Sequence, residues 1–358
     1  MNNVLLKKIF HQFEVKDSCK EILPYGSGNI HDTYVCKLRD SSLRYLLQKI
    51  NLHVFPAPDK VMENISLVTS FLQKKWQKIS PQNVDRRVLK IIPTITGKNF
   101  YQDTSGNSWR MYHFICRSVC YENITKSLQG KKIAGAFALF QKLLLDFPVE
   151  KLYPVIPQFH NICKRFSDLE NAIEKDSYGR YSDIKELAKQ LVQHEDFCKE
   201  VANFETYLPL KVVHNDTKVN NILFDVKSKE AICVVDLDLV MPGFSIYDFG
   251  DLARSATCHK ERGKFIFRSD YFEALLNGYM EEAQHFLNNA EKKYLIDSCK
   301  VIACELAFRF LTDYLEGDKY FKISHPFHNL DRVKRQIQFI NSLDSQRQLV
   351  EAMFRKYK

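Results

Sequence analysis

The segment that most constrains this chain is residues 214–221, which is followed by an apolar stretch that ends at Asp236. Phosphoryl transfer needs a carboxylate to orient the acceptor hydroxyl, an amide and a second carboxylate to hold Mg²⁺, and a lysine near the moving phosphoryl group. Asp216 and Asn221 have the Asp-x-x-x-x-Asn spacing of such a catalytic loop, and Lys218 follows the first carboxylate by two residues. The pattern predicts Asp216 as the base, Lys218 as the cation, and Asn221 with Asp236 as metal ligands.

Two further aspartates follow the predicted metal ligand. Side chains two residues apart share a face of an extended segment, so we expect both Asp236 and Asp238 to reach the site, with Asp238 on metal-bound water or substrate. Asp248 opens an Asp-Phe-Gly triplet, but it also begins a predicted helix that continues through Arg254. We therefore predict that Asp248 accepts backbone N–H bonds and braces the loop.

Length and composition limit the classes of protein that the chain can belong to. With 358 residues, of which 45% are apolar, it can form two domains or one two-lobed catalytic unit. Its apolar runs fall short of the ~18 residues of a membrane span, and the first residues lack a signal-peptide pattern, so we expect a cytoplasmic protein without membrane attachment. The net charge of +9 comes from basic residues interleaved with acidic ones, which favours a mixed surface over nucleic-acid binding.

The chain divides by pattern into two parts. Residues 1–115 alternate β-type runs with turns, interrupted by one helix at 61–75, with strands expected at 33–38, 44–50, 88–92 and 110–115. Residues 116–358 are mainly helical, with apolar residues at helical spacing over 133–145, 184–201, 271–286, 294–315 and 330–353. This order predicts an α+β fold with two lobes: a nucleotide-binding lobe with a mainly antiparallel sheet at 1–115, and a catalytic and substrate-binding lobe at 116–358.

Nucleotide-binding candidates lie in the first part. The turn formed by Gly26, Ser27, Gly28 and Asn29 is small enough to let backbone N–H groups approach a phosphate, although such a turn is also common in plain hairpins. Lys49 on a strand and Glu63 on the following helix are candidates for the ion pair that positions the α- and β-phosphates. Alternate strand residues face opposite ways, so Gln48 could face the nucleotide in place of Lys49.

These motifs resemble the aminoglycoside phosphotransferase-like branch of the protein-kinase-like fold. Closer still, the chain is similar to the N-acetylhexosamine 1-kinases, in segments that span nearly its whole length: 28–34, 214–223, 235–243 and 309–321. That resemblance implies ATP- and Mg²⁺-dependent phosphorylation of the anomeric hydroxyl of GlcNAc or GalNAc. It also implies that Asp216, Arg309 and Tyr320 hold the sugar and that the loop around His31 covers it.

Arg309 could also have a purely structural role, and the motifs of the chain also fit functions other than a sugar kinase. Arg309 has Glu305 and Asp313 four residues to either side, as in an ordinary surface ion-pair ladder. The whole pattern also fits another small-molecule kinase, of the choline, amino-alcohol or aminoglycoside type. A third interpretation is a non-catalytic nucleotide-binding protein on the same scaffold, although such a protein does not need Asp216, Asn221 and Asp236 together.

Overall fold

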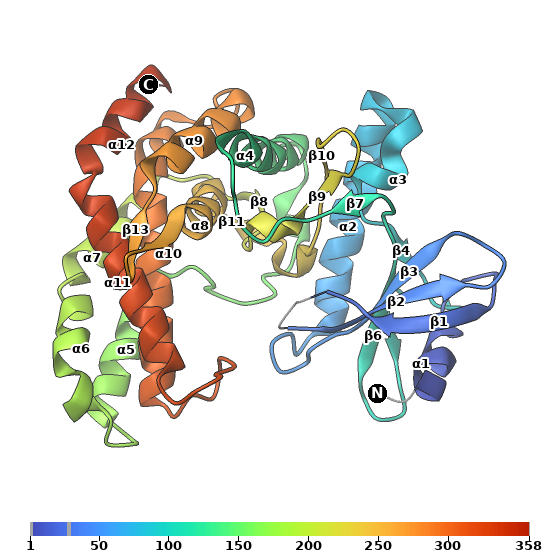
Figure 1. Cartoon of the computed structure of the whole chain (residues 1–358), viewed down its shortest axis with the longest axis horizontal. Coiled ribbons are helices and arrows are strands. Elements are labelled where there is room, and N and C mark those ends of the chain that lie inside the picture. Colours follow the sequence, from blue (N-terminus) through green and yellow to red (C-terminus); the bar gives the residue numbers. More distant parts are fainter. Residues whose placement is uncertain (1–2, 27–29, 358) are drawn as a thin grey trace. The chain divides into compact units, whose positions relative to one another are not determined.

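A computed structural model describes residues 3–26 and 30–357. The chain forms two compact units, each assembled from separate segments (Figure 1). Unit 1 comprises residues 1–120, 146–156 and 221–242, and unit 2 comprises residues 121–145, 157–220 and 243–358. The first border therefore falls at Cys120, a few residues beyond the border predicted from pattern, and two later segments return to unit 1.

Unit 1 is built on a six-stranded antiparallel sheet in the order β1-β2-β3-β6-β4, with β5 paired to β6. Its strands are β1 (Cys19–Pro24), β2 (Asp32–Leu38), β3 (Arg44–Lys49), β4 (Ile91–Ile92), β5 (Tyr101–Gln102) and β6 (Ser108–His113). A smaller sheet in the order β10-β9-β7 contains β7 (Ser118–Val119), β9 (Ile222–Asp225) and β10 (Ala231–Val234). Unit 1 also holds the helices α1 (Asn3–Phe10), α2 (Pro58–Ile79) and α3 (Val84–Arg87) and the 3₁₀ turn η5 (Leu237–Leu239).

The two faces of the main sheet have different chemistry because side chains alternate along each strand. One face packs with α1 into an apolar core that includes Tyr34, Leu47 and Trp109. The opposite face carries polar residues, since Gln48 of β3 lies opposite Arg110 of β6 in the strand register. A polar row on a sheet face needs partners, and these lie within the same unit.

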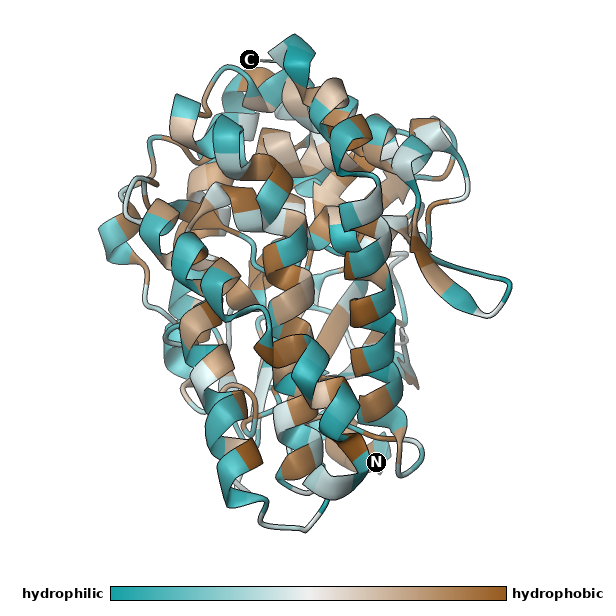
Figure 2. Ribbon diagram, turned by 90° about the vertical axis from the view of Figure 1, so that its left-hand side faces the viewer, coloured by the Kyte–Doolittle hydropathy of each residue, from teal (hydrophilic) through white to brown (hydrophobic). Residues whose placement is uncertain are grey.

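Unit 2 is mainly helical, with short strands between the helices. Its helices are α4 (Ser127–Leu143), α5 (Ile162–Lys175), α6 (Lys185–Val192), α7 (Glu195–Glu205), α8 (Ser245–Thr257), α9 (Ser269–Ala283), α10 (Asn289–Leu315), α11 (His328–Ser345) and α12 (Arg347–Phe354). Its strands are β8 (Lys211–Val213), β12 (Cys258–Glu261) and β13 (Lys264–Phe267), and the chain passes from unit 1 to unit 2 within β11 (Met241–Gly243). The helices alternate hydrophobic and hydrophilic segments along their length (Figure 2), as amphipathic helices around a core do.

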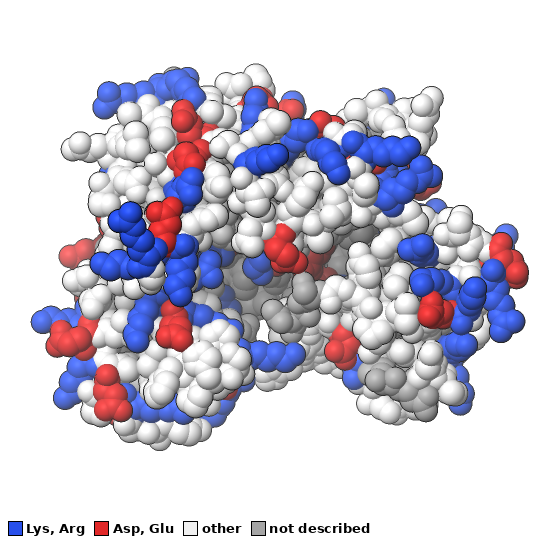
Figure 3. Space-filling model, in the orientation of Figure 1, with Lys and Arg blue, Asp and Glu red and all other residues white. Residues whose placement is uncertain are grey.

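Helix α10 organises the core of unit 2. Asn288 and Glu291 form a capping box at its N-terminus, which satisfies two backbone N–H groups that would otherwise lack partners. It packs against α5, α8 and α11. On the outside of the unit, basic and acidic side chains are interspersed over the face seen in Figure 3.

The predicted α+β class is confirmed, as are most of the predicted elements. Two predictions of single helices were wrong: 184–201 is divided into α6 and α7, and 330–353 into α11 and α12. A break of one or two residues leaves the apolar periodicity nearly in phase, so the pattern did not reveal it. The elements α1, β1 and α5 were not predicted from the sequence. Among the described residues, no helix is long and apolar enough to cross a membrane.

Candidate functional site

The loop that carries Asp216 is held in unit 2 by Asp248 of α8. The backbone N–H groups of His214 and Asn215 donate to the two carboxylate oxygens of Asp248 at 3.0 and 2.8 Å. Gln141 of α4 donates to the same carboxylate at 2.8 Å, and Asp248 is only 1% exposed. This arrangement confirms that Asp248 accepts backbone bonds and braces the loop. Burial raises the pKa of Asp248, and these donors only partly oppose that effect.

The predicted base, Asp216, and the predicted cation, Lys218, form an ion pair within that loop. The ammonium of Lys218 lies 2.6 Å from Oδ1 of Asp216. The side chain of Asp216 is 22% exposed, so its carboxylate is partly accessible to solvent. Burial lowers the pKa of Lys218, but the charges of Asp216 and Asp251 outweigh it and raise that pKa, so Lys218 is a cation at neutral pH.

Arg309 and Tyr320 come together at the end of α10. The helix ends at Leu315, and Gly317 adopts a left-handed conformation with φ +91°, so the chain turns back. The guanidinium of Arg309 then donates to the hydroxyl of Tyr320 at 3.4 Å. It also lies over the rings of Phe159, Tyr320 and Phe321, with distances to the ring centres of 5.5, 5.6 and 5.4 Å.

The ion-pair ladder predicted as an alternative for Arg309 forms on one side only. Arg309 pairs with Glu305 at 3.3 Å. Asp313 instead accepts from the backbone N–H groups of Tyr320 and Phe321 at 2.7 and 3.0 Å, which holds the returning loop against the helix. Asp313 therefore positions Tyr320 rather than extending a surface ladder.

Glu305 and His160 join this cluster: the sequence predicted Glu305 only as an ion-pair partner of Arg309, and it did not predict His160. Glu305 is 1% exposed, and Nδ1 of His160 lies 2.6 Å from its carboxylate. Burial raises the pKa of Glu305, but the charges of His160, Arg309 and Arg165 outweigh it and hold that pKa below its usual value. The one signal in the sequence is a glutamate inside the buried apolar stripe of a long helix, where an ionised carboxylate needs partners.

The two predicted metal ligands lie on adjoining segments of unit 1. Asn221 ends a 3₁₀ turn and is 7% exposed, and its carbonyl oxygen accepts from the backbone N–H of Val235 at 2.9 Å. Asp236, the next residue, is exposed and left-handed, with φ 64° and ψ 61°. Asp236 therefore does not lie in an extended strand, and the expectation that it shares a strand face with Asp238 was wrong, because the chain turns into η5 at this point.

A magnesium ion fits the chemistry of this pair. Carboxylate and amide oxygens are the ligands that Mg²⁺ prefers, and the ion usually takes one or two protein carboxylates together with phosphate and water. The described part of the chain has no cluster of three or more His, Cys, Asp or Glu that could hold a metal by itself. Asn221 and Asp236 would therefore hold the ion together with phosphate and water oxygens.

Asp238 is enclosed in a polar network of unit 1. Its two carboxylate oxygens accept from the two terminal nitrogens of Arg110, one of them at 2.9 Å. The Nε of Arg110 donates to the side-chain oxygen of Gln48 at 3.0 Å. Burial raises the pKa of Asp238, but Arg110 and His31 outweigh it and lower that pKa below its usual range. Both oxygens are thus engaged and Asp238 is buried, and contact of Asp238 with substrate stays a prediction.

His31 joins the same network. Its Nδ1 accepts from the backbone N–H of Asn51 at 3.0 Å, so in the neutral ring Nε2 carries the proton and donates to Asp238. The ring stacks on Phe55 with 5.7 Å between the centres, and only 7% of the side chain is exposed. A sugar contact through either ring nitrogen of His31 therefore requires an exchange of hydrogen bonds.

The predicted nucleotide-binding residues are dispersed over unit 1. Lys49 lies opposite Trp109 in the register and two residues after buried Leu47, so it shares their face of the sheet, the α1 side. Glu63 is exposed on α2, and within the described part of the chain it forms no ion pair with Lys49. Gly26 has φ +80°, a conformation that favours glycine. Ser27, Gly28 and Asn29 lie outside the described residues.

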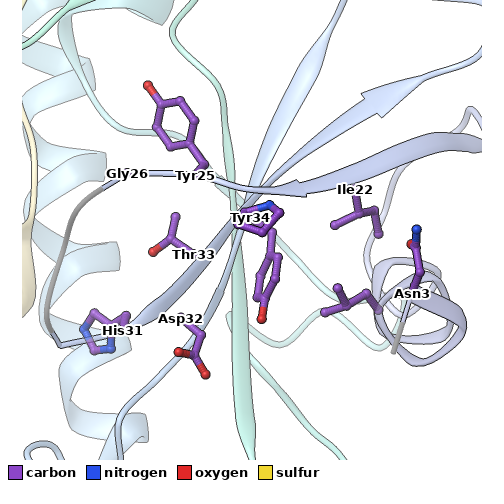
Figure 4. A pocket seen from close by; sticks show the side chains of 10 residues that line it. Asn3, Ile22, Tyr25, Gly26, His31, Asp32, Thr33 and Tyr34 are labelled. Carbon is purple, nitrogen blue, oxygen red and sulfur yellow. The ribbon is translucent and has the colours of Figure 1, made fainter. Parts of the chain in front are cut away.

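A cavity of about 330 Å³ opens beside Gly26, between α1 and the start of β2. Figure 4 shows Asp32 and Tyr34 on one side of β2, with Thr33 directed the other way. The cavity lies on the α1 side of the sheet, and its lining includes neither Asn221 nor Asp236. It is thus separate from the predicted metal ligands.

Comparison with known proteins places these features in context. Residues 104–286, just over half of the chain, match the model of a family described as phosphotransferase enzyme family. An aminoglycoside phosphotransferase from Alicyclobacillus acidocaldarius has a similar structure, with 15% identity, 96% of each chain covered and a TM-score of 0.61. An amicoumacin kinase bound to AMP-PNP and Ca²⁺ covers 94% of this chain and 93% of its own, at 13% identity and a TM-score of 0.63. A choline kinase from Cryptosporidium parvum has 16% identity, covers 99% of this chain and 98% of its own, and has a TM-score of 0.53.

Proposed function

The chain belongs to the phosphotransferase enzyme family, and from this premise we propose that it phosphorylates the anomeric hydroxyl of N-acetylated hexosamines. In this reaction the anomeric oxygen forms a bond to the γ-phosphorus of ATP as the bond to the β,γ-bridging oxygen breaks. The hydroxyl proton passes to Asp216, and the products are the sugar 1-phosphate and ADP. The similar structures share the fold, so the choice of acceptor has to come from the residues of this chain.

The observation that carries the choice of sugar is the pairing of Arg309 with Tyr320 in unit 2. A guanidinium and a phenol present several donors and one acceptor, which suits a polyhydroxy ligand that carries an amide. Both groups are preorganised: Glu305 and the aromatic rings hold Arg309, and Asp313 holds the loop of Tyr320. Preorganised polar groups lose little conformational entropy when a ligand binds.

The same cluster argues against a cationic acceptor. Choline and aminoglycosides carry positive charge, and recognition of a quaternary ammonium typically uses a cage of aromatic rings. In unit 2 the rings of Phe159, Tyr320 and Phe321 already surround the guanidinium of Arg309. A second cation at these rings would meet a like charge at short range, so a neutral acceptor fits better.

The remaining roles follow from chemistry. Asp216 orients the acceptor and takes its proton, and Lys218 offsets the charge of the moving phosphoryl group. Asn221 and Asp236 would hold Mg²⁺, which neutralises charge on the nucleotide phosphates when it is bound. We assign the turn at Gly26 to the nucleotide, and we propose that Gln48 lies on the nucleotide side of the sheet in place of Lys49, because it shares a face with Arg110 and the Asp238 network.

The test is release of ADP from Mg-ATP with a panel of acceptors. We expect turnover with GlcNAc or GalNAc and none with the matching 1-O-methyl glycosides, in which the anomeric oxygen is blocked. Choline and an aminoglycoside serve as charged comparison acceptors. Turnover of a methyl glycoside would show that another hydroxyl is attacked, and turnover of choline or the aminoglycoside alone would replace the sugar by a cationic acceptor.

A further inference from the structure

The residues after Asp236 are tied to the rest of unit 1 at two points. Asp238, in η5, is held by both terminal nitrogens of Arg110, which comes from β6, 128 residues away in sequence. Asn64 of α2 donates to the carbonyl oxygen of Val240 at 2.9 Å, directly after η5. The short turn that starts at Asp236 is therefore clamped by one strand and one helix.

Arg110 is itself fixed from several sides. It is 2% exposed, its Nε is held by Gln48, and its guanidinium lies 5.3 Å from the ring centre of Tyr112. Gln48 in turn donates to the hydroxyl of Thr33 on β2 at 3.0 Å. All three nitrogens of the Arg110 guanidinium donate hydrogen bonds within this network, Nε to Gln48 and the two terminal nitrogens to Asp238. It therefore acts on other protein groups rather than on the nucleotide.

Asp236 needs such a clamp. A non-glycine residue in the left-handed region costs about 1 kcal/mol or more and persists only where its surroundings determine it. Asp236 is exposed, and its position depends on the turn that follows it. The negative charge of Asp236 is also felt by Arg110, whose pKa is raised because Asp238 and Asp236 outweigh the opposing effect of burial.

We propose that Arg110 is a positioning residue for the metal carboxylate of Asp236, acting through Asp238. His31 extends the same clamp to the segment before β2, since its Nε2–H donates to Asp238. In many kinases a strand lysine and a helix glutamate supply the organising ion pair of the nucleotide lobe. In unit 1 of this chain Arg110 and Asp238 form a buried ion pair, while Lys49 lies on the other face of the sheet and Glu63 is exposed. The inference rests on the proposed function, because it assumes that Asp236 meets a nucleotide-bound metal.

The test measures nucleotide binding and needs no acceptor. AMP-PNP binding to the full chain is titrated with MgCl₂ by calorimetry, and the half-saturating Mg²⁺ concentration is compared between variants. Arg110→Lys keeps the charge but removes the planar fork that holds both oxygens of Asp238. Residues that orient a metal ligand typically change metal affinity by about 10- to 100-fold, so we expect a rise of about 10-fold or more in half-saturating Mg²⁺. Binding of AMP-PNP in EDTA is expected to stay unchanged.

Two variants separate this role from a general loss of stability. Arg86→Lys is the matched control, because Arg86 pairs with Asp225 at 2.7 Å in the same unit and donates to the carbonyl oxygens of Cys116 and Arg117, none of which belongs to the turn at Asp236. It is expected to lower the melting temperature without a change in half-saturating Mg²⁺. Asp238→Asn is the second probe, since its amide can accept only one of the two Arg110 bonds, and it is expected to reproduce the Mg²⁺ effect of Arg110→Lys.

The outcomes distinguish this inference from the proposed function. If Asp236→Asn raises the half-saturating Mg²⁺ and both Arg110→Lys and Asp238→Asn leave it unchanged, the positioning role is overturned and the metal assignment stands. An equal rise in Arg86→Lys would also overturn it, because any lost ion pair would then have the same effect. If Asp236→Asn itself has no effect on Mg²⁺-dependent binding, the metal assignment in the proposed function fails.

Discussion

Asp216 is the residue on which the proposed chemistry depends most directly. Asp216→Asn keeps the size of the side chain but removes its ability to accept the proton of the acceptor, and Lys218 loses its carboxylate partner. We expect kcat to fall by about 10²- to 10⁴-fold, the usual contribution of a general base, with the fold and nucleotide binding retained. Steady-state kinetics and AMP-PNP calorimetry would measure the two effects separately.

The control for this change is Asp196→Asn, because the side chain of Asp196 is 99% exposed on α7 of the same unit. Its kinetics should match those of the wild-type protein. Turnover of Asp216→Asn within a few-fold of wild type would remove Asp216 from the mechanism and leave its carboxylate as a structural partner of Lys218.

Arg309 is the residue that separates a sugar-binding role from an ordinary helix ion pair. If it donates to the acceptor, Arg309→Ala loses a hydrogen bond from a charged donor, worth about 1.5–3 kcal/mol. We expect the sugar KM to rise by about 10- to 150-fold while the ATP KM changes little. If Arg309 served only as the partner of Glu305, which is 1% exposed, Arg309→Ala would lower the melting temperature and leave both KM values unchanged.

Arg347→Ala is the comparison for this prediction. Arg347 pairs with Asp297 at 2.6 Å and with Glu351 four residues away, and it lies on α12 in the same unit. The Arg347→Ala variant should have a slightly lower melting temperature than the wild-type protein and unchanged KM values for the sugar and for ATP. An unchanged sugar KM in Arg309→Ala would return Arg309 to a structural role.

At the scale of elements, helix α8 and the loop before Asp216 behave as one piece because Asp248 connects them. Asp248→Ala leaves the backbone N–H groups of His214 and Asn215 without their buried acceptor, at about 1–3 kcal/mol for each unsatisfied group. We expect a marked drop in melting temperature and in kcat, since the loop loses its support. Thermal unfolding and kinetics on the same sample would show the two losses together.

Asp248→Asn is the informative second variant. Its amide oxygen can still accept one of the two backbone bonds, so it should fall between wild type and Asp248→Ala in both measurements. A well-folded Asp248→Ala that has specifically lost Mg²⁺-dependent nucleotide binding would instead make Asp248 the metal ligand and would contradict the assignment of Asp236.

At the scale of the whole molecule, stability should decline in acid. The folded-state pKa of Asp238 lies below the usual value of an aspartate. Between the folded-state and unfolded-state pKa values the unfolded chain therefore binds more protons than the folded chain. The contribution is present above the unfolded-state pKa of about 4 and is lost as pH falls through the folded-state pKa. Glu305, with a lowered pKa, acts in the same direction. Glu205 acts in the opposite direction, because burial raises its pKa.

Urea unfolding at about pH 5 and about pH 3.5, on either side of the unfolded-state pKa, would measure this decline. We expect the free energy of unfolding to fall over that interval, and to fall less steeply in Asp238→Asn, which lacks the titrating group. Equal slopes in the two proteins would mean that Asp238 is not a carboxylate stabilised by Arg110 and His31. Asp196→Asn again serves as a control, because that exposed side chain should leave the slope unchanged.

Local patterns in the sequence were sufficient for much of this protein. Helical and strand periodicity reflects which side chains face a core, and that information is contained in neighbouring residues. The spacing of Asp216 and Asn221 predicted a phosphoryl-transfer loop. Asp248 was predicted to brace that loop because a carboxylate at the start of a helix is well placed to accept backbone N–H bonds. The α+β class and most element positions followed from the same short-range patterns.

Which distant residues meet depends on how the whole chain folds. Arg110 and Asp238 are 128 residues apart, and His160 and Glu305 are 145 apart, so no local pattern links either pair. Lys49 and Gln48 could not be told apart from sequence because a shift of one residue reverses the face of a strand. The left-handed turn at Asp236 likewise depends on what holds the segment after it. Neighbouring residues specify the chemical groups and their local order, whereas burial and long-range pairing in the folded chain specify which of these groups are held by partners and which are accessible to a ligand.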